Sequence, residues 1–167
     1  IQFDELMVPH IFAKTDEDLF YAQGYITAYH RLWQMEFQLL ATEGRVSEVV
    51  GARAIDYDKS QRRRGMKHAA MLSEDQLRKD EEVYRLAKAY SDGVNAYISQ
   101  LEYKNYPIEY KLLDYEPEPW TVYKTCLLLK LMSSDLSLGE MDLENTNLIT
   151  ALGEETYKLL FPARHPG

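Results

Sequence analysis

The sequence has little cysteine and fewer basic than acidic residues, and each of these features limits the class of protein that it can encode. It contains one cysteine, Cys126, which therefore has no partner within the chain. Because Cys126 lies in the apolar run CLLLKLM, we expect a small buried core residue there. Nineteen basic residues against 27 acidic ones give a net charge of −8, which excludes a broad basic surface for nucleic acid or an anionic membrane. The one basic cluster, QRRRG at residues 61–65, is flanked by acidic stretches, and we expect it to be a solvated loop that pairs with nearby acids.

The sequence also lacks a long apolar run without charged residues, of the kind that spans a lipid bilayer. The most apolar helical stretch covers residues 19–44, but His30 and Arg31 lie near its middle, where lipid would make each costly. At helical spacing its apolar residues form two stripes on different sides: Leu19, Ala22, Ile26, Tyr29, Trp33, Phe37 and Leu40, and Phe20, Gly24, Ala28, Leu32, Met35 and Leu39. A helix with two apolar faces must be covered on both. Gly24 and Ala28 also leave a small-residue patch where another backbone could come close.

The chain as a whole is predicted to be mainly α, a single domain over residues 1–167. Residues 1–13 alternate in hydropathy and include Pro9, which favours one or two short extended segments. Thr15 with Asp18 three residues later is typical of a helix start. Gly44 is typical of the end of that helix, because a left-handed residue can satisfy the last carbonyls.

Further capping residues predict the remaining helices. Ser73 with Gln76 predicts the start of a long helix that reaches about residue 101. Thr121 predicts the cap of a helix over residues 122–136, and Gly153 separates two final helices.

Four motifs occur in a fixed order: VPHI at residues 8–11, QGY…RLWQME at 23–36, GRVSEVVG at 44–51 and DGVNAYI at 92–98. With YDKSQRRRG, YEPEPW and LMSSDLS they resemble the α subunit of the penicillin acylase family. This family comprises heterodimeric N-terminal-nucleophile amidohydrolases, including penicillin, cephalosporin and acyl-homoserine-lactone acylases. The resemblance covers nearly the whole chain. It departs from the family at Met7, where glycine is usual, and at His30, where an acid is usual.

The resemblance implies an α subunit that wraps a β chain cut from the same precursor, completing an αββα fold. The nucleophilic serine would be the first residue of the β chain, with its own α-amino group as base, because a hydroxyl needs a neighbouring base near neutral pH. This chain would then hold no catalytic residue, and His10 would be structural. The implied reaction is hydrolysis of the amide bond of an N-acylated small molecule, a β-lactam or a related acyl amide.

Two site roles also follow from the resemblance alone. Met132 falls on a family acyl-pocket position and Leu136 one helical turn later, although methionine and leucine at this spacing are more often core residues. Leu136 stands where some penicillin G acylases have an aromatic residue, and Asp135 where they have a basic one. Asp142 falls on a position that contributes a carboxylate to a structural calcium shared with the β chain; calcium prefers six to eight oxygen ligands, so this could be only part of a site. Alternatively, Asp142 simply favours the N-terminus of the helix that follows.

Several alternatives stay open at this level. Within the family, the chain could belong to an acyl-homoserine-lactone or cephalosporin acylase; in another class, it could be a non-catalytic helical binding subunit. We expect a leader upstream of Ile1 and a periplasmic or otherwise exported product, with no membrane span and no nucleic-acid partner.

Overall fold

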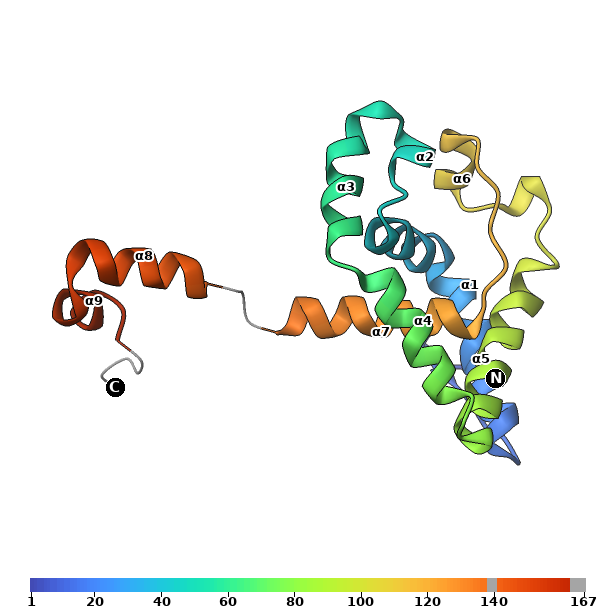
Figure 1. The fold of residues 1–167 in the computed structure, drawn as a ribbon. Helices are drawn as coiled ribbons and strands as arrows, with labels where there is room; N and C mark the ends of the chain where they lie inside the picture. The colour runs from blue at the N-terminus through green and yellow to red at the C-terminus, as the bar shows by residue number, and fades with distance from the viewer. Residues whose placement is uncertain (138–140, 163–167) are drawn as a thin grey trace. The chain divides into compact units, whose positions relative to one another are not determined.

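The computed structural model describes residues 1–137 and 141–162, and this part of the chain is mostly helical (Figure 1). The elements are β1 (Gln2–Phe3), β2 (Pro9–His10), α1 (Asp16–Glu43), α2 (Ser47–Val50), η1 (Ala52–Ala54), α3 (Ile55–Arg63), α4 (Met66–Leu77), α5 (Glu81–Ile98), η2 (Tyr103–Asn105), α6 (Ile108–Leu113), α7 (Val122–Leu136), α8 (Asp142–Leu152) and α9 (Glu154–Leu160). None of the described helices is long and apolar enough to cross a membrane.

The chain divides into two compact units, Ile1–Ser134 and Asp135–Gly167. Residues 138–140 and 163–167 lie outside the described residues, so the prediction of a single domain over residues 1–167 stays a prediction.

The N-terminal segment is a hairpin in which β1 and β2 run antiparallel, with Gln2 opposite His10. Asp4 holds its turn: one carboxylate oxygen accepts the backbone N–H groups of Leu6 and Val8 at 2.9 and 2.8 Å, and the other lies 3.1 Å from His10 Nε2. The contact with His10, followed by these backbone hydrogen bonds, lowers the pKa of Asp4. His10 therefore contributes to the hairpin itself.

Met7 adopts a left-handed backbone conformation, with φ of +61°. L residues other than glycine disfavour this region by roughly 1–2 kcal/mol, because Cβ approaches the carbonyl oxygen that follows. Glycine would adopt this conformation without that strain. Met7 therefore occupies this turn in a strained backbone conformation.

Helix α1 begins and ends where its capping residues predict. Thr15 Oγ1 accepts the N–H of Asp18 at 3.1 Å, and Gly44 is left-handed with φ of +68°. The helix is not uniform, because Arg31 near its middle has non-helical angles (φ −138°, ψ 15°) and marks a kink.

Helices α1 and α5 pack with their backbones in close contact at two glycines. A Cβ added at Gly24 would lie 2.0 Å from the carbonyl oxygen of Tyr90, and one at Gly93 would lie 1.9 Å from the carbonyl oxygen of Tyr21. Neither separation is possible for real atoms, so both positions require glycine. The predicted close approach of another backbone at Gly24 is confirmed.

The second apolar stripe of α1 faces the core of the first unit. This core contains Ala28, Leu32, Met35 and Leu39 from α1, together with Ala70, Val94, Tyr110, Trp120, Val122, Cys126 and Leu127. Cys126 is buried as expected. The first stripe is only partly covered within this chain: Ile26 and Leu40 are buried, whereas Leu19 and Tyr29 remain exposed. One apolar face of α1 is thus internal and the other is open at its N-terminal end.

Two predictions of local structure were wrong. Ser73 does not start a helix, because the chain is already helical from Met66. The next helix starts after a break, where extended Asp80 accepts the N–H of Val83 at 3.2 Å. The loop predicted at residues 61–65 is wrong for its first three residues, which belong to helix α3, whereas Arg64 and Gly65 form a turn.

Candidate functional site

The start of α7, the helix that carries the predicted pocket residues, is anchored on α5. The side chain of Asn95 in α5 makes two hydrogen bonds with the backbone of Trp120: its amide donates to the carbonyl oxygen at 2.8 Å and its oxygen accepts the N–H at 2.7 Å. Trp120 Nε1 then donates to Thr125 Oγ1 at 2.9 Å. Thr121 Oγ1 accepts the N–H of Lys124 at 3.3 Å, which confirms the predicted cap. These contacts fix the position from which α7 extends.

Burial changes along α7. Val122, Cys126 and Leu127 in its first half are buried. Met132 and Leu136 in its last turns are 42% and 75% exposed. Met132 is not part of the buried core of the first unit, and Leu136 belongs to the second unit. Their assignment to an acyl pocket stays a prediction.

Asp142, the predicted calcium ligand, is the first residue of α8 and is exposed. Its backbone carbonyl oxygen accepts a hydrogen bond from Thr146 Oγ1 at 2.7 Å, so the backbone contact is an ordinary helical one. Among the described residues, no group of three His, Cys, Asp or Glu side chains could hold a metal ion. The assignment of Asp142 to a calcium site shared with a second chain stays a prediction.

Sequence analysis missed a buried carboxylate on α1. Glu36 is 3% exposed and accepts three hydrogen bonds: from the Tyr110 hydroxyl, from the Tyr115 hydroxyl at 3.1 Å and from the N–H of Glu118 at 2.8 Å. Burial raises the pKa of Glu36, and burial beside Glu36 raises the pKa of Tyr110. The signal in the sequence was a charged residue on a buried apolar stripe, between Leu32 and Leu39, since such a group requires partners.

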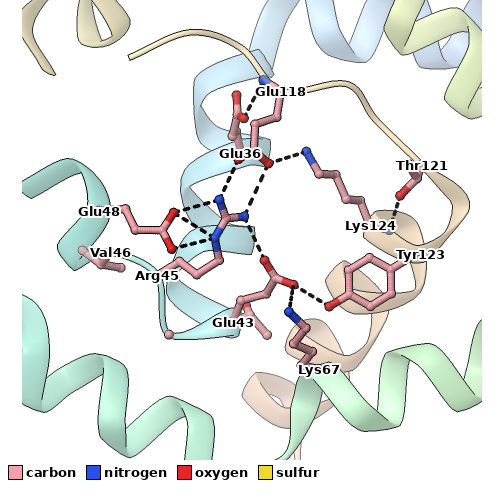
Figure 2. Close-up of polar contacts among 12 residues, drawn as sticks. Glu36, Glu43, Arg45, Val46, Glu48, Lys67, Glu118, Thr121, Tyr123 and Lys124 are labelled. Carbon is pink, nitrogen blue, oxygen red and sulfur yellow. Dashed lines mark hydrogen bonds and ion pairs between the residues drawn. The ribbon is translucent and has the colours of Figure 1, made fainter. Parts of the chain in front are cut away.

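Arg45, just after α1, is the centre of a second cluster (Figure 2). Its guanidinium lies 2.6 Å from Glu118, 2.8 Å from Glu48 and 3.1 Å from Glu43. Lys124 in α7 also contacts Glu118, at 3.0 Å. Arg45 lowers the pKa of Glu118 to about 2, with Lys124 adding to the effect. The cluster ties the end of α1 to the segment before α7.

The charged cluster around Arg45 has the properties of a structural network that holds neighbouring segments together, rather than those of a catalytic centre. Its carboxylates are in contact with hydrogen-bond donors. Arg45 and Glu43, which are among the residues that line a cavity of about 520 Å³ beside the cluster, are hydrogen-bonded to each other. Outside it, Ser133 Oγ donates to the carbonyl oxygen of Leu129 at 2.8 Å, a contact within its own helix. The absence of catalytic residues from this chain stays a prediction.

The fold defines the class of protein. It matches a chain of the thermostable penicillin G acylase from Alcaligenes faecalis with a TM-score of 0.75 and 26% sequence identity, covering 99% of this chain and 95% of that one. This chain therefore shares its mostly helical fold with a chain of that penicillin G acylase. The penicillin amidase family model matches residues 1–166. The chain therefore belongs to the penicillin amidase family.

Curated relatives include more than one kind of acylase. The chain is 29% identical to penicillin G acylase from Escherichia coli, over 91% of this chain and 18% of that protein. It is 35% identical to the penicillin acylase 2 proenzyme of Pseudomonas sp. strain SE83, over 78% and 16%. It is 29% identical to the acyl-homoserine lactone acylase QuiP of Pseudomonas aeruginosa, over 97% and 19%. The chain spans about a fifth of the length of these relatives.

Proposed function

We propose that this chain is the α subunit of a two-chain amidohydrolase that cleaves the amide bond of an N-acylated small molecule. The observation that carries the proposal is the match of the family model to residues 1–166. The substrate would be a β-lactam or a related acyl amide, as the names of the penicillin acylase relatives suggest.

Coverage supports the two-chain arrangement. The chain matches only 18% of the E. coli enzyme but 95% of one chain of the Alcaligenes enzyme. The Pseudomonas relative is named a proenzyme, which fits release of a shorter chain from a longer precursor. The exposed apolar residues at the N-terminal end of α1 are also what a second chain would cover.

Under this proposal the nucleophile is the N-terminal serine of the β subunit. Its hydroxyl attacks the amide carbonyl while the α-amino group takes the proton and passes it to the departing amine; water then hydrolyses the acyl ester. An α-amino group titrates near pH 8, which suits this role near neutral pH. The α chain would contribute to substrate binding.

That contribution would come from the last turns of α7. Met132 and Leu136 are exposed in this chain, so they can face an acyl group when the second chain is present. Helix α7 would hold these two side chains in place. The start of the helix is fixed by the hydrogen bonds of Asn95 to Trp120, and its first half is buried in the core.

Asp142 would supply one carboxylate to a calcium ion shared with the β subunit. Calcium would stabilise the assembled enzyme by bridging the two chains, as a ligand that binds only the native state does. Adding a chelator should lower the melting temperature of the wild-type enzyme, and the variant Asp142→Asn should lose this response. Equal chelator responses in both proteins would exclude Asp142 as a ligand.

The decisive experiment uses the complete gene product. We expect it to separate into two chains under denaturing conditions, with a serine, threonine or cysteine at the start of the larger chain by N-terminal sequencing. It should hydrolyse at least one member of a panel of acyl amides, including penicillin G. A complete product that hydrolyses no acyl amide would favour a non-catalytic binding subunit. Cell fractionation of the same strain tests the expected periplasmic or exported location.

Acyl-homoserine lactone hydrolysis is the second candidate, because the QuiP relative matches 97% of this chain. A cephalosporin acylase is the third. Penicillin G, a long-chain acyl-homoserine lactone and a cephalosporin amide should be compared by kcat/KM in one panel. The preferred substrate separates the three candidates directly.

A further inference from the structure

The basic cluster at residues 61–65 is a sequence motif that the proposed function leaves unexplained. The sequence predicts that its arginines pair with nearby acids. In the structure Arg62, Arg63 and Arg64 are exposed, and none of the three makes an ion pair with a described residue. The predicted pairing is therefore wrong, and contact with carboxylates does not neutralise these charges.

A turn at the end of this cluster joins α3 to α4 beside the cavity of about 520 Å³ that also borders the Arg45 cluster. Gly65 is left-handed in this turn, with φ of +72°, and α4 begins at the next residue. Arg62 near the end of α3 and Lys67, His68 and Met71 in α4 all line the cavity. Its volume lies within the range of about 300–1,000 Å³ that is typical of small-molecule sites.

Arg62 brings unoccupied hydrogen-bond donors to this cavity. Its Nε donates to the carbonyl oxygen of Gly44 at 2.9 Å, which holds the side chain at the end of α1. Its two terminal nitrogens make no hydrogen bond with any described residue. The planar guanidinium can donate two parallel hydrogen bonds to one carboxylate, so these nitrogens suit a carboxylate ligand.

The acidic groups that line the cavity are already held by Arg45. The Arg45 guanidinium lies 3.1 Å from Glu43 and 2.8 Å from Glu48. Asp58, which interacts electrostatically with Arg62, is buried and accepts two backbone N–H groups at the start of α2, at 2.9 and 2.8 Å. The cations on the α3–α4 side of the cavity are therefore the ones available to an incoming anion.

Met66 and Met71 give the same cavity an apolar wall. Met66 is partly buried against the core of the first unit, whereas Met71 is 51% exposed. Methionine side chains are flexible and polarizable, so they adapt to apolar groups of different shapes. Beside the cations, this wall favours a ligand with an apolar chain and a charged end over a bare inorganic anion.

We propose that this cavity binds a small amphiphilic carboxylate, an apolar chain that ends in one carboxylate group. Arg62 holds the carboxylate, and the apolar chain contacts Met66 and Met71. Lys67, whose ion pair with Glu43 is a long contact of 3.8 Å, adds positive charge (Figure 2). The site does not depend on the proposed function, because it belongs to the first unit and no predicted acyl-pocket residue lines it.

Calorimetric titration of the complete protein with octanoate tests the site. Arg62→Gln should weaken binding at least about tenfold, because the carboxylate loses a charge-assisted hydrogen-bond partner. Arg63→Gln removes the same charge from the neighbouring residue, which does not line the cavity, and should stay within about twofold of the wild type. Equal effects of the two substitutions, or no saturable binding to the wild type, would overturn the proposal.

A second matched pair leaves Arg62 and its contact with Gly44 in place. Met71→Glu puts a carboxylate on the cavity wall and should weaken octanoate binding at least about tenfold by repulsion. Leu72→Glu adds the same charge at the next residue, which is 52% exposed but does not line this cavity, and should stay within about twofold of the wild type. If Met71→Glu binds octanoate as the wild type does, octanoate lies elsewhere and the proposal is wrong.

Two further probes test the class of ligand. Octanol has the same apolar chain without the charge, and inorganic phosphate has charge without the chain; each should bind at least about tenfold more weakly than octanoate. Octanol that binds as tightly as octanoate would exclude recognition by Arg62. Phosphate that binds as tightly would show an anion site without selectivity for the apolar chain and would overturn the assignment.

Nuclear magnetic resonance of isotope-labelled methionine methyl groups locates the bound octanoate. The signals of Met66 and Met71, assigned by substitution with leucine, should shift during the titration. Met132 reports on the predicted acyl pocket separately. A shift at Met132 alone would place octanoate in that pocket and overturn this proposal. Shifts at Met66 and Met71 would support the proposal even in a protein that hydrolyses no acyl amide.

Discussion

Two regions of this chain are mostly helical in their described residues but differ in how their apolar side chains are buried. In the first unit, α1 and α5 pack through Gly24 and Gly93, and the side chains between the helices form a continuous buried core. In the second, α8 and α9 present apolar side chains of similar size, and none of their described residues is buried. Hydrophobic content alone therefore does not show which apolar side chains are buried. The difference lies in whether small residues and hydrogen-bonded polar groups let neighbouring elements close over the apolar side chains.

Replacing a glycine at the helix crossing should give the largest effect. Gly93→Ala puts a Cβ against the backbone of Tyr21, so the helices must separate. We expect a loss of about 3 kcal/mol or more in the free energy of unfolding, at the upper end of the range for overpacking. Denaturant unfolding of the complete protein measures it, with Gln23→Ala on the exposed side of α1 as a control that should change stability by less than about 0.5 kcal/mol. An unchanged midpoint for Gly93→Ala would show that the crossing is not tight.

Removal of the buried carboxylate should come next. Glu36→Ala leaves two tyrosine hydroxyls and one backbone N–H without their acceptor inside the core, at a cost of about 2–4 kcal/mol. Glu17→Ala removes a carboxylate from an exposed ion pair with Arg85 and should cost less than about 1 kcal/mol. The two variants are compared by thermal and denaturant unfolding. Similar losses would mean that the Glu36 network does not stabilise the fold.

Substitutions along α7 compare its buried and exposed halves. If Met132 lines the acyl pocket, Met132→Ala should favour bulkier acyl groups and Met132→Phe smaller ones, by about 1–3 kcal/mol per methylene in the ratio of kcat/KM values. Leu127→Ala in the buried half should instead cost about 2–5 kcal/mol of stability and leave this ratio unchanged. Lost stability with an unaltered acyl preference in Met132→Ala would contradict the pocket assignment. Leu136 would lose its assignment with it.

The charged cluster should make stability depend on pH. The pKa of Glu118 falls from its usual 4.5 to about 2 in the folded chain, so its contribution is present above pH 4.5 and is lost as pH falls toward 2. Glu36 has the opposite sign: its raised pKa favours the fold while protonated, and that contribution is lost as pH rises through the raised value. Glu118→Gln should therefore lower stability by about 1–2 kcal/mol at pH 7, after allowance for solvent screening, and by little near pH 2. A difference from wild type that stays constant between pH 2 and 7 would exclude this ionisation.

The smallest effect is expected in the hairpin. Met7→Gly relieves the left-handed strain but adds freedom to the unfolded chain, so we expect a net stabilisation of about 0.5 kcal/mol. Leu6→Gly, at the neighbouring residue without positive φ, should only destabilise. Melting temperatures of the two variants give the comparison, and destabilisation by both would contradict the strain at Met7.

Capping residues and motif order predicted much of the fold. Thr15, Gly44, Thr121 and Gly153 each mark a helix boundary in the structure, because a cap acts within one turn and needs no distant partner. The prediction that Ser73 starts a helix was wrong because several nearby residues can also cap a helix, and because helix α4 continues past Ser73. Asp80 was an equally good candidate for the helix cap. The structure decides between the two, because α4 ends at Leu77 and α5 begins directly after Asp80.

Contacts between distant parts of the chain could not be predicted from the sequence in this way. The apolar stripe on α1 and the small residue at Gly24 indicated a close helix partner, but the identity of that partner, α5, depended on a long-range crossing. The Glu36 and Arg45 clusters join segments more than 70 residues apart, and no local pattern links Glu36 to Tyr110 or Arg45 to Glu118. Met132, Leu136 and Asp142 came from family resemblance, and the structure adds their exposure.

The sequence by itself therefore determined the helical class, most helix boundaries and membership of an acylase family, because these depend on local propensity and on the order of motifs. Tertiary structure alone decided which apolar face of α1 is buried and which carboxylates are held inside the first unit. The physical reason is that burial and pKa depend on neighbours brought together by the whole fold. Leu19 and Leu32 of α1 have the same hydrophobicity, but only Leu32 has other side chains packed over it in the core of the first unit.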